Sequence, residues 1–313
     1  MDGLAQAPRV RLFFRDEYVY DVQEAGMRHT HDVLRARRVR DALLADGLVQ
    51  PKDFHAAPPL SDAQLLLVHT PDYVRALHDP ALLARSLLLD PSHPWDERLL
   101  QPFAYAAGGT VAAAREAVAH GSIAVNLGGG FHHAQADKAE GFCAIADVAV
   151  AIRQLQGDGL LERALIVDLD YHHGNGNALL FANDERVFTY SLHSVPWCFV
   201  EKRNHEDVML PPRADDAAYL GALHATLPSV FDRFHPELVL YLAGSDPFVL
   251  DTLGDARVSE QGMLERDRFV TELVRGRGLP LVVTMAGGYG PDSWRIYRNY
   301  FSWLLREHGA SAR

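Results

Sequence analysis

The sequence predicts an α/β fold, with a single domain built on a parallel β-sheet that carries helices on both faces. Short apolar runs alternate along the chain with longer segments of helical pattern, and this alternation is typical of parallel strands joined by helical crossovers. The runs are continuously apolar, which indicates strands buried on both faces. No repeat, low-complexity tract or Pro/Gly/Ser linker divides the 313 residues, so we expect one domain over residues 1–313.

Six strands are expected from the apolar runs, at residues 10–14, 123–127, 164–169, 187–192, 238–243 and 281–285. Helical segments are expected near residues 29–47, 61–78, 101–119, 143–157, 216–233, 259–276 and 291–306. Ser61 followed by Asp62 resembles an N-cap with an acidic residue in the first turn of a helix. Gly121 is a stop signal at the end of another helix.

The composition excludes several classes of protein. There are 30 Lys and Arg against 41 Asp and Glu, so the net charge is -11 and nucleic-acid binding is not favoured. Cys143 and Cys198 are too few for a disulfide framework or a cysteine-based zinc site, and they fit a reducing compartment. The first ten residues lack the pattern of a secretory signal, and no run approaches the roughly 20 apolar residues of a membrane span. We therefore expect a cytoplasmic protein with neither nucleic acid nor membrane as partner.

The strongest chemical motif follows the strand expected at residues 164–169. Asp168, Asp170 and His172 stand two residues apart there, so in an extended chain their side chains point the same way. Carboxylates at the end of a buried strand are costly unless they are paired or bind a metal, and this edge of a parallel sheet is where ligands bind. The alternative is a polar strand end with a glycine turn.

Three further strands are each followed by glycines and polar side chains. These side chains are His132 and His133, then Asp246, and finally Tyr289. Adjacent histidines are weak signals by themselves, and Gly-Ser-Asp is a common turn. Four strands that each deliver polar groups to one edge of the sheet are poorly explained by coincidence, so we interpret this edge as an active site.

These side chains suit metal-assisted hydrolysis of an amide or ester. Asp170, His172 and Asp246 form an oxygen and nitrogen ligand set that leaves open positions on a catalytic zinc ion, which lowers the pKa of bound water to roughly 7 and polarises a carbonyl. His132 and His133 can act as general base and acid, and Tyr289 can donate a hydrogen bond to a developing oxyanion. Fe(II) also suits this ligand set.

The motifs resemble those of the zinc-dependent histone deacetylase superfamily, which has the arginase–deacetylase fold. The sequences of these motifs are most similar to those of class IV and bacterial deacetylase-like members. The matching motifs stand in the family's order and are GGGFHHA, GFCAIAD, DLDYHHGNG, YSLH, AGSD and GGYG, preceded by VHTPDYV and by PWDERLL with AGGT.

The resemblance implies an eight-stranded parallel sheet and assigns Asp170, His172 and Asp246 as zinc ligands. It implies that His133 is the general base and that His132 beside it protonates or stabilises electrostatically. Asp168 would orient His132. The resemblance also implies a structural potassium ion, held by Asp168, Asp170, His172, Ser191 and Leu192.

The resemblance places Gly141 and Phe142 on one side of an acyl-lysine channel. The opposite wall is expected from the loop at 193–200, with Trp197 and Phe199 as candidates. This loop belongs to the least regular stretch of the chain, residues 193–215, and a long connection in a compact domain is usually functional.

Asn175 departs from the class I pattern, which has an aspartate as the partner of the second histidine. Class II and class IV members carry asparagine at this position. A neutral amide stabilises an imidazolium less than a carboxylate does, so the pKa of His133 should differ from that in class I members.

The leading interpretation is a zinc-dependent hydrolase of the ε-amide of acyl-lysine, acting on an acylated protein or peptide. The alternative is a small-molecule amidohydrolase, for example on acetylpolyamines, for which Glu201, Glu206 and Asp207 could supply an acidic entrance. A ureohydrolase and a non-catalytic acyl-lysine binder are less favoured. The resemblance of the motifs to class IV members, with small Ala and Gly residues around them, predicts that acyl chains longer than acetyl are accepted. The sequence leaves open the physiological target and the oligomeric state.

Overall fold

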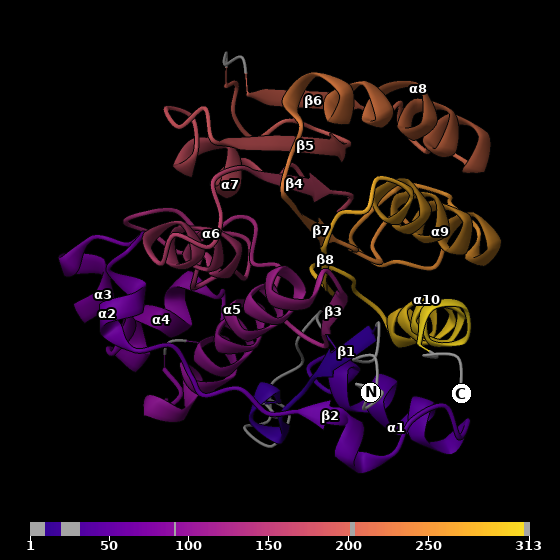
Figure 1. The fold of residues 1–313 in the computed structure, drawn as a ribbon. Helices are drawn as coiled ribbons and strands as arrows, with labels where there is room; N and C mark the ends of the chain where they lie inside the picture. The colour runs from indigo at the N-terminus through magenta and orange to yellow at the C-terminus, as the bar shows by residue number, and fades with distance from the viewer. Residues whose placement is uncertain (1–9, 20–31, 91, 201–203, 310–313) are drawn as a thin grey trace, which may run out of the picture.

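The computed structural model describes residues 10–19, 32–90, 92–200 and 204–309. Its centre is an eight-stranded sheet in the order β2-β1-β3-β8-β7-β4-β5-β6, in which every paired strand is parallel to its neighbours (Figure 1). This confirms the single α/β domain with a parallel sheet and the eight strands that the resemblance implies. The strands are β1 (Val10–Phe13), β2 (Phe54–His55), β3 (Ile123–Asn126), β4 (Ala164–Asp168), β5 (Val187–His193), β6 (His205–Met209), β7 (Leu238–Leu242) and β8 (Leu281–Thr284).

The two strands absent from the sequence prediction, β2 and β6, form the edges of the sheet. An edge strand is not buried on both faces, so β6 has the polar sequence HEDVM in place of an apolar run. Strand β2 has only two residues, too few for a period to be recognised.

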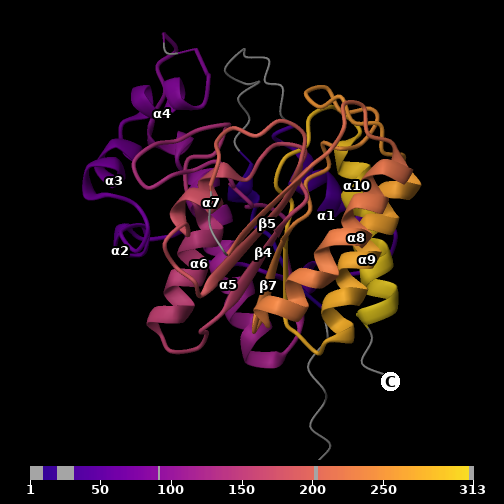
Figure 2. The same cartoon turned by 90° about the horizontal axis from the view of Figure 1, so that it is seen from above.

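Helices cover both faces of the sheet (Figure 2). One side carries α1, α8, α9 and α10, and the other carries α2 to α7 (Figure 1). Their bounds are α1 (Arg35–Ala45), α2 (Asp62–Leu65), α3 (Pro71–Leu77), α4 (Pro80–Ser86), α5 (Gln101–His120), α6 (Asp147–Gly157), α7 (Asn175–Leu180), α8 (Asp216–Phe234), α9 (Glu260–Gly276) and α10 (Ser293–His308), with short 3-10 turns at Asp16–Tyr18, Pro51–Asp53 and Glu97–Leu99.

The prediction of one helix over residues 61–78 was wrong, because the segment forms the separate helices α2 and α3. Pro71 lies in the first turn of α3, where its missing N–H has no cost, and the Thr70 side chain caps that turn. The N-cap at Ser61 and the left-handed stop at Gly121 are both confirmed. Helices α4 and α7 were not predicted. Residues 29–31 of the first predicted helix lie outside the described residues, as do the first nine residues of the chain.

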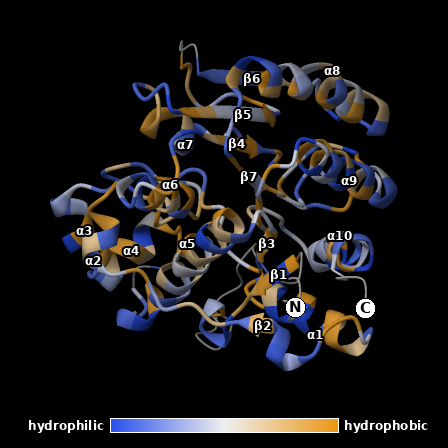
Figure 3. Ribbon diagram, viewed as in Figure 1, coloured by the Kyte–Doolittle hydropathy of each residue, from blue (hydrophilic) through white to orange (hydrophobic). Residues whose placement is uncertain are grey.

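The core consists of two apolar layers, one on each face of the sheet. Alternate residues of β4 divide between them, with Leu165 and Val167 in the layer under α8, α9 and α10 and with Ala164 and Ile166 in the layer under α5 and α6. Strands β3, β4 and β7 accordingly stand out as hydrophobic in Figure 3. Within the described part of the chain, no helix combines the length and apolar character needed to cross a membrane.

Neighbouring strands β3, β8, β7 and β4 occupy the middle of the sheet. Because the strands are parallel, their carboxyl ends meet at one edge. These are the four strands that the predicted site residues follow, so the fold brings together segments separated by more than 100 positions in the sequence.

Candidate active site

Asp170, His172 and Asp246 lie together at the carboxyl ends of β4 and β7, with one ligand atom of each within 4.8 Å of the others. The Nδ1 atom of His172 is 3.2 Å from Oδ1 of Asp170 and 2.9 Å from Oδ2 of Asp246. The three side chains predicted from alternate strand positions and from a second strand therefore converge as expected.

Backbone N–H groups fix the carboxylates of this cluster. The N–H of Gly287 donates to Oδ2 of Asp170 at 2.7 Å, and the N–H of Tyr171 donates to Oδ1 of Asp246 at 2.9 Å. A side chain at Gly287 would overlap both carboxylates. The orientation of the cluster is therefore held by three separate loops.

The donor set fits a divalent metal ion. Both carboxylates are fully buried, and His172 is the side chain placed between them. Burial, and next the negative charge of Asp170, raise the pKa of Asp246 to about 8. Two carboxylates and one histidine leave open coordination positions, as catalytic zinc sites do, and a cation here would offset the cost of burying the two charges.

The histidine pair lies directly beside this cluster, with ring centroids 3.9 Å apart. Nδ1 of His132 is 2.8 Å from Oδ2 of Asp168, and its Nε2 is 3.7 Å from Asp170. Burial lowers the pKa of His132, but the carboxylates of Asp168 and Asp170 outweigh burial and raise it to about 9. The two histidines are thus electrostatically unequal.

His133 has a neutral partner in place of a carboxylate. Its Nδ1 is 2.6 Å from Oδ1 of Asn175. Burial, and next the charge of His132, hold the pKa of His133 well below its usual range. A neutral imidazole whose Nδ1 carries the proton and donates it to Oδ1 of Asn175 has its lone pair on Nε2, which is then the atom that can accept a proton.

Two carboxylates that the sequence analysis did not single out also support the histidine pair. Asp147, fully buried, accepts the N–H groups of Gly130 at 2.9 Å and Phe131 at 2.8 Å, which fixes the glycine loop that carries the histidines. Glu140 accepts from Nδ2 of Asn175 at 2.8 Å. Glu140 directly precedes the GFCAIAD motif and Asp147 ends it, so the available signal was an acidic residue at each end of this motif.

Tyr289 lies beside the metal-type cluster formed by Asp170, His172 and Asp246; it is buried, with its ring centroid 5.9 Å from that of His172. Phe142 faces it at 6.0 Å, on a loop that also contains Gly141. The N–H of Tyr289 donates to Asp251 at 2.6 Å, which anchors the glycine loop around it.

Of the two candidates for the opposite wall, the structure brings Trp197 to the site. Its ring stacks on His133 with centroids 4.0 Å apart and planes 3° from parallel. Phe199 is 86% exposed and points into solvent.

The side chains assigned to a potassium ion are also adjacent. The register of β4 with β5 pairs Asp168 with Ser191, and Leu192 follows in β5. Oγ of Ser191 accepts the N–H of Gly174, and both Ser191 and Leu192 are buried.

A second cluster, formed by His173, His193 and Asp207, has the spacing of a metal site. The N–H of Trp197 donates to Nδ1 of His173 at 3.1 Å, so a neutral His173 carries its proton on Nε2, the atom 3.1 Å from Asp207. That proton leaves no lone pair on Nε2 for a metal, so we interpret the contact of His173 with Asp207 and the hydrogen bond from Trp197 as holding the loop of Trp197.

The acidic residues considered for a polyamine entrance are engaged elsewhere. Asp207 contacts His173 and His205, and Glu206 forms an ion pair with Arg233 on α8. Glu201 lies outside the described residues.

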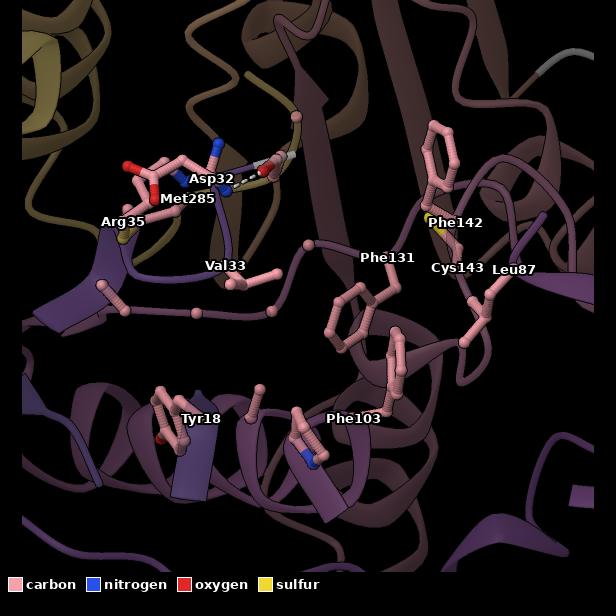
Figure 4. Close-up of a pocket in the computed structure, with 18 of the residues that line it drawn as sticks. Tyr18, Asp32, Val33, Arg35, Leu87, Phe103, Phe131, Phe142, Cys143 and Met285 are labelled. Atoms are coloured by element: carbon pink, nitrogen blue, oxygen red, sulfur yellow. Dashed lines mark hydrogen bonds between the residues drawn. The ribbon is translucent and has the colours of Figure 1, made fainter. Parts of the chain in front are cut away.

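A cavity of about 170 Å³ adjoins the site (Figure 4). His132, Gly287 and Tyr289 line its end at the metal-type cluster, and mostly apolar side chains line the rest. The rings of Phe103 and Phe131 face each other within it, 5.3 Å apart. An apolar chain entering from the catalytic cluster would find apolar walls.

The protein is thus an α/β protein with an all-parallel sheet, whose site contains a cluster of two carboxylates and a histidine suited to a metal, next to a histidine pair and a tyrosine. The chain belongs to the histone deacetylase family, since the model of the histone deacetylase domain matches residues 29–302. Membership in this family supports deacetylase activity and implies a metal cofactor, typically zinc.

The chain is similar to three further proteins, two of which are named as a histone deacetylase or a histone deacetylase homologue. An uncharacterized protein of Picosynechococcus is 37% identical over 90% of this chain and 92% of its own length. Histone deacetylase 2 of Arabidopsis thaliana is 32% identical over 92% of this chain and 77% of its own. The crystal structure of a histone deacetylase homologue from Aquifex aeolicus, 28% identical, covers 95% of this chain and 84% of its own, with a TM-score of 0.76.

Proposed function

We propose that the protein hydrolyses the ε-amide of acyl-lysine in a zinc-dependent reaction. The observation that carries the proposal is the convergence of Asp170, His172 and Asp246 beside the unequal pair His132 and His133. This arrangement supplies a ligand set and two differently tuned proton-transfer groups within one buried site.

The ligands of the metal would be Asp170, His172 and Asp246. When bound there, zinc supplies Lewis-acid polarisation of the substrate carbonyl and promotes ionisation of water. A structural potassium ion would be held by Asp168, Asp170, His172, Ser191 and Leu192.

The chain's own side chains divide the proton transfers. His133, neutral and with Nδ1 bound to Asn175, accepts the proton of the attacking water at Nε2. His132, kept protonated by Asp168, stabilises the negative charge that develops in the site and provides a proton for the leaving amine. The hydroxyl of Tyr289 donates a hydrogen bond to the oxyanion.

The substrate side chain would pass between Phe142 and Trp197. Aromatic walls exclude water from the aliphatic part of the lysine side chain, and polar contacts to the amide fix the position of the substrate. Of the acidic candidates that the structure describes, Glu206 pairs with Arg233 and Asp207 contacts His173, which favours acyl-lysine in a protein or peptide over an acylated polyamine.

The test is turnover by the zinc-loaded protein on peptides with acetyl- and longer acyl-lysine, compared with acetylpolyamines through kcat/KM. His133→Ala should lose most turnover, since a general base contributes roughly 10²–10⁴-fold, and His132→Ala should lose less. Equal losses, or the reverse order with the metal retained, would contradict the assigned roles. Higher kcat/KM on polyamines would favour the small-molecule alternative.

A further inference from the structure

The partner of His133 raises a problem of orientation. A neutral imidazole has one N–H and one lone pair, and His133 can act as a base at Nε2 only when its proton is on Nδ1. An asparagine can present either its carbonyl oxygen or its NH₂ group to Nδ1. Asn175 alone therefore does not select the catalytic tautomer, whereas a carboxylate in its place would.

Glu140 removes this ambiguity. Its Oε2 is 2.8 Å from Nδ2 of Asn175, and an ionised carboxylate can only accept hydrogen bonds. Asn175 must then turn its NH₂ group toward Glu140 and its oxygen toward His133, which it meets at 2.6 Å. Nδ1 of His133 is thereby required to be the donor.

The surroundings of Glu140 keep it ionised and in place. Nε2 of Gln135 donates to Oε2 of Glu140 at 2.8 Å, and Nζ of Lys138 lies 3.1 Å from Oε1. The backbone of Glu140 pairs with that of Cys143 in both directions, at 3.2 and 2.8 Å. The carboxylate is therefore held from its side chain and from its backbone.

We propose that Glu140 is a positioning residue that sets the tautomer of the general base through Asn175. The chain Glu140–Asn175–His133 places a carboxylate two hydrogen bonds from the base, where a neutral amide alone would leave the proton position undetermined. This inference rests on the proposed role of His133 in acyl-lysine hydrolysis.

The test is a swap of the two groups. Glu140→Gln replaces the carboxylate by an amide that can present either a donor or an acceptor, and we expect kcat to fall about 10- to 100-fold, the range for a lost charge-assisted hydrogen bond, with a smaller change in KM. Asn175→Asp alone sets two carboxylates against each other and should also lower kcat. The double variant, Glu140→Gln with Asn175→Asp, restores one carboxylate and one amide in reversed order, and its kcat should exceed that of either single variant.

A matched control is Glu206→Gln, which removes a glutamate that pairs with Arg233 on α8 and should leave kcat unchanged. Glu140→Gln also removes the repulsion that lowers kcat in Asn175→Asp, so the comparison that decides is between the double variant and Glu140→Gln. If Glu140 serves only to stabilise the loop, the double variant will be no more active than Glu140→Gln, and that result would overturn the proposal.

A second measurement does not depend on turnover. Nitrogen NMR of ¹⁵N-histidine-labelled protein, with His133→Gln used for assignment, should show neutral His133 with its proton on Nδ1 in the wild type. In Glu140→Gln it should show a mixture of the Nδ1–H and Nε2–H tautomers. A proton on Nε2 in the wild type, or the same tautomer in both proteins, would overturn the proposal. If the wild type hydrolyses no acyl-lysine substrate but the tautomers follow this pattern, the proposed function fails and the positioning role stands.

Discussion

Replacing Gly141 by alanine should disable the general base without removing a catalytic group. Gly141 has φ +53°, and a Cβ built on it would overlap Cδ2 of His133 and lie 2.7 Å from Cγ and 2.9 Å from Nε2. Ordinary contact between carbon atoms requires about 3.5–4.0 Å, so the ring must move by about 1 Å. A displacement of this size at a reacting group can cost about 10²-fold in rate.

Gly159 provides the matched control. It has φ +69°, and no atom lies within 4 Å of a Cβ built on it. Alanine should cost about 1–2 kcal/mol of folding stability at either position, because both backbones are left-handed. The two variants therefore share the backbone strain, and the contact with His133 belongs to Gly141→Ala alone.

The assay is kcat and KM on the best acyl-lysine peptide, together with metal content and the free energy of unfolding. We expect about a 10²-fold loss of kcat in Gly141→Ala, with full metal content, and normal kcat in Gly159→Ala. Near-normal kcat in Gly141→Ala would show that the ring position of His133 does not limit turnover, and the reasoning would fail.

Four further outcomes are expected. Asp246→Ala should lose its zinc, and metal analysis showing a fully loaded variant would contradict the ligand assignment. Tyr289→Phe should lower kcat by roughly 10²–10³-fold while metal content and stability change little, and near-normal kcat would remove the hydroxyl from the mechanism. Peptides with acyl chains longer than acetyl should be hydrolysed because the adjoining cavity is apolar, and a substrate series in which acetyl far outperforms every longer chain would end this idea. Burial lowers the pKa of His69, whose Nε2 accepts the N–H of Ala146. The neutral imidazole therefore stabilises the fold fully above the usual pKa of 6.5, and this contribution is lost as the pH falls below 6.5. His69→Gln should reduce the decline in unfolding free energy between pH 7.5 and 5.5, and an unchanged decline would exclude this histidine as its cause.

The central strands and the polar groups that follow them could be predicted from the sequence because both rest on local patterns. The run ending in Asp168 is apolar on both faces, and the spacing of Asp170 and His172 places them on one side. The edge strand β6 could not be found in this way, since exposure removes the apolar run that marks a buried strand. The split between α2 and α3 was available in the sequence, at Pro71.

The partners of the site residues were less accessible to sequence reasoning. Glu140 meets Asn175 across 35 positions, and Trp197 reaches His133 through a loop whose path follows no repeating pattern. Such contacts are set by tertiary packing and not by the period of one segment. Such contacts also show that Trp197, and not Phe199, lies at the site, although the sequence offered no reason to prefer either aromatic residue.

The position of β8 has a consequence for how the chain reaches its folded state. It is the last strand to leave the ribosome, yet it lies between β3 and β7 in the middle of the sheet. Until residues 281–284 are inserted, the earlier strands form two separate groups, β2-β1-β3 and β7-β4-β5-β6, with an open edge on each. His133 belongs to one group and Asp170 to the other, so a nascent chain that ends before β8 has no assembled site, and the two open edges make it the stage most exposed to aggregation during synthesis.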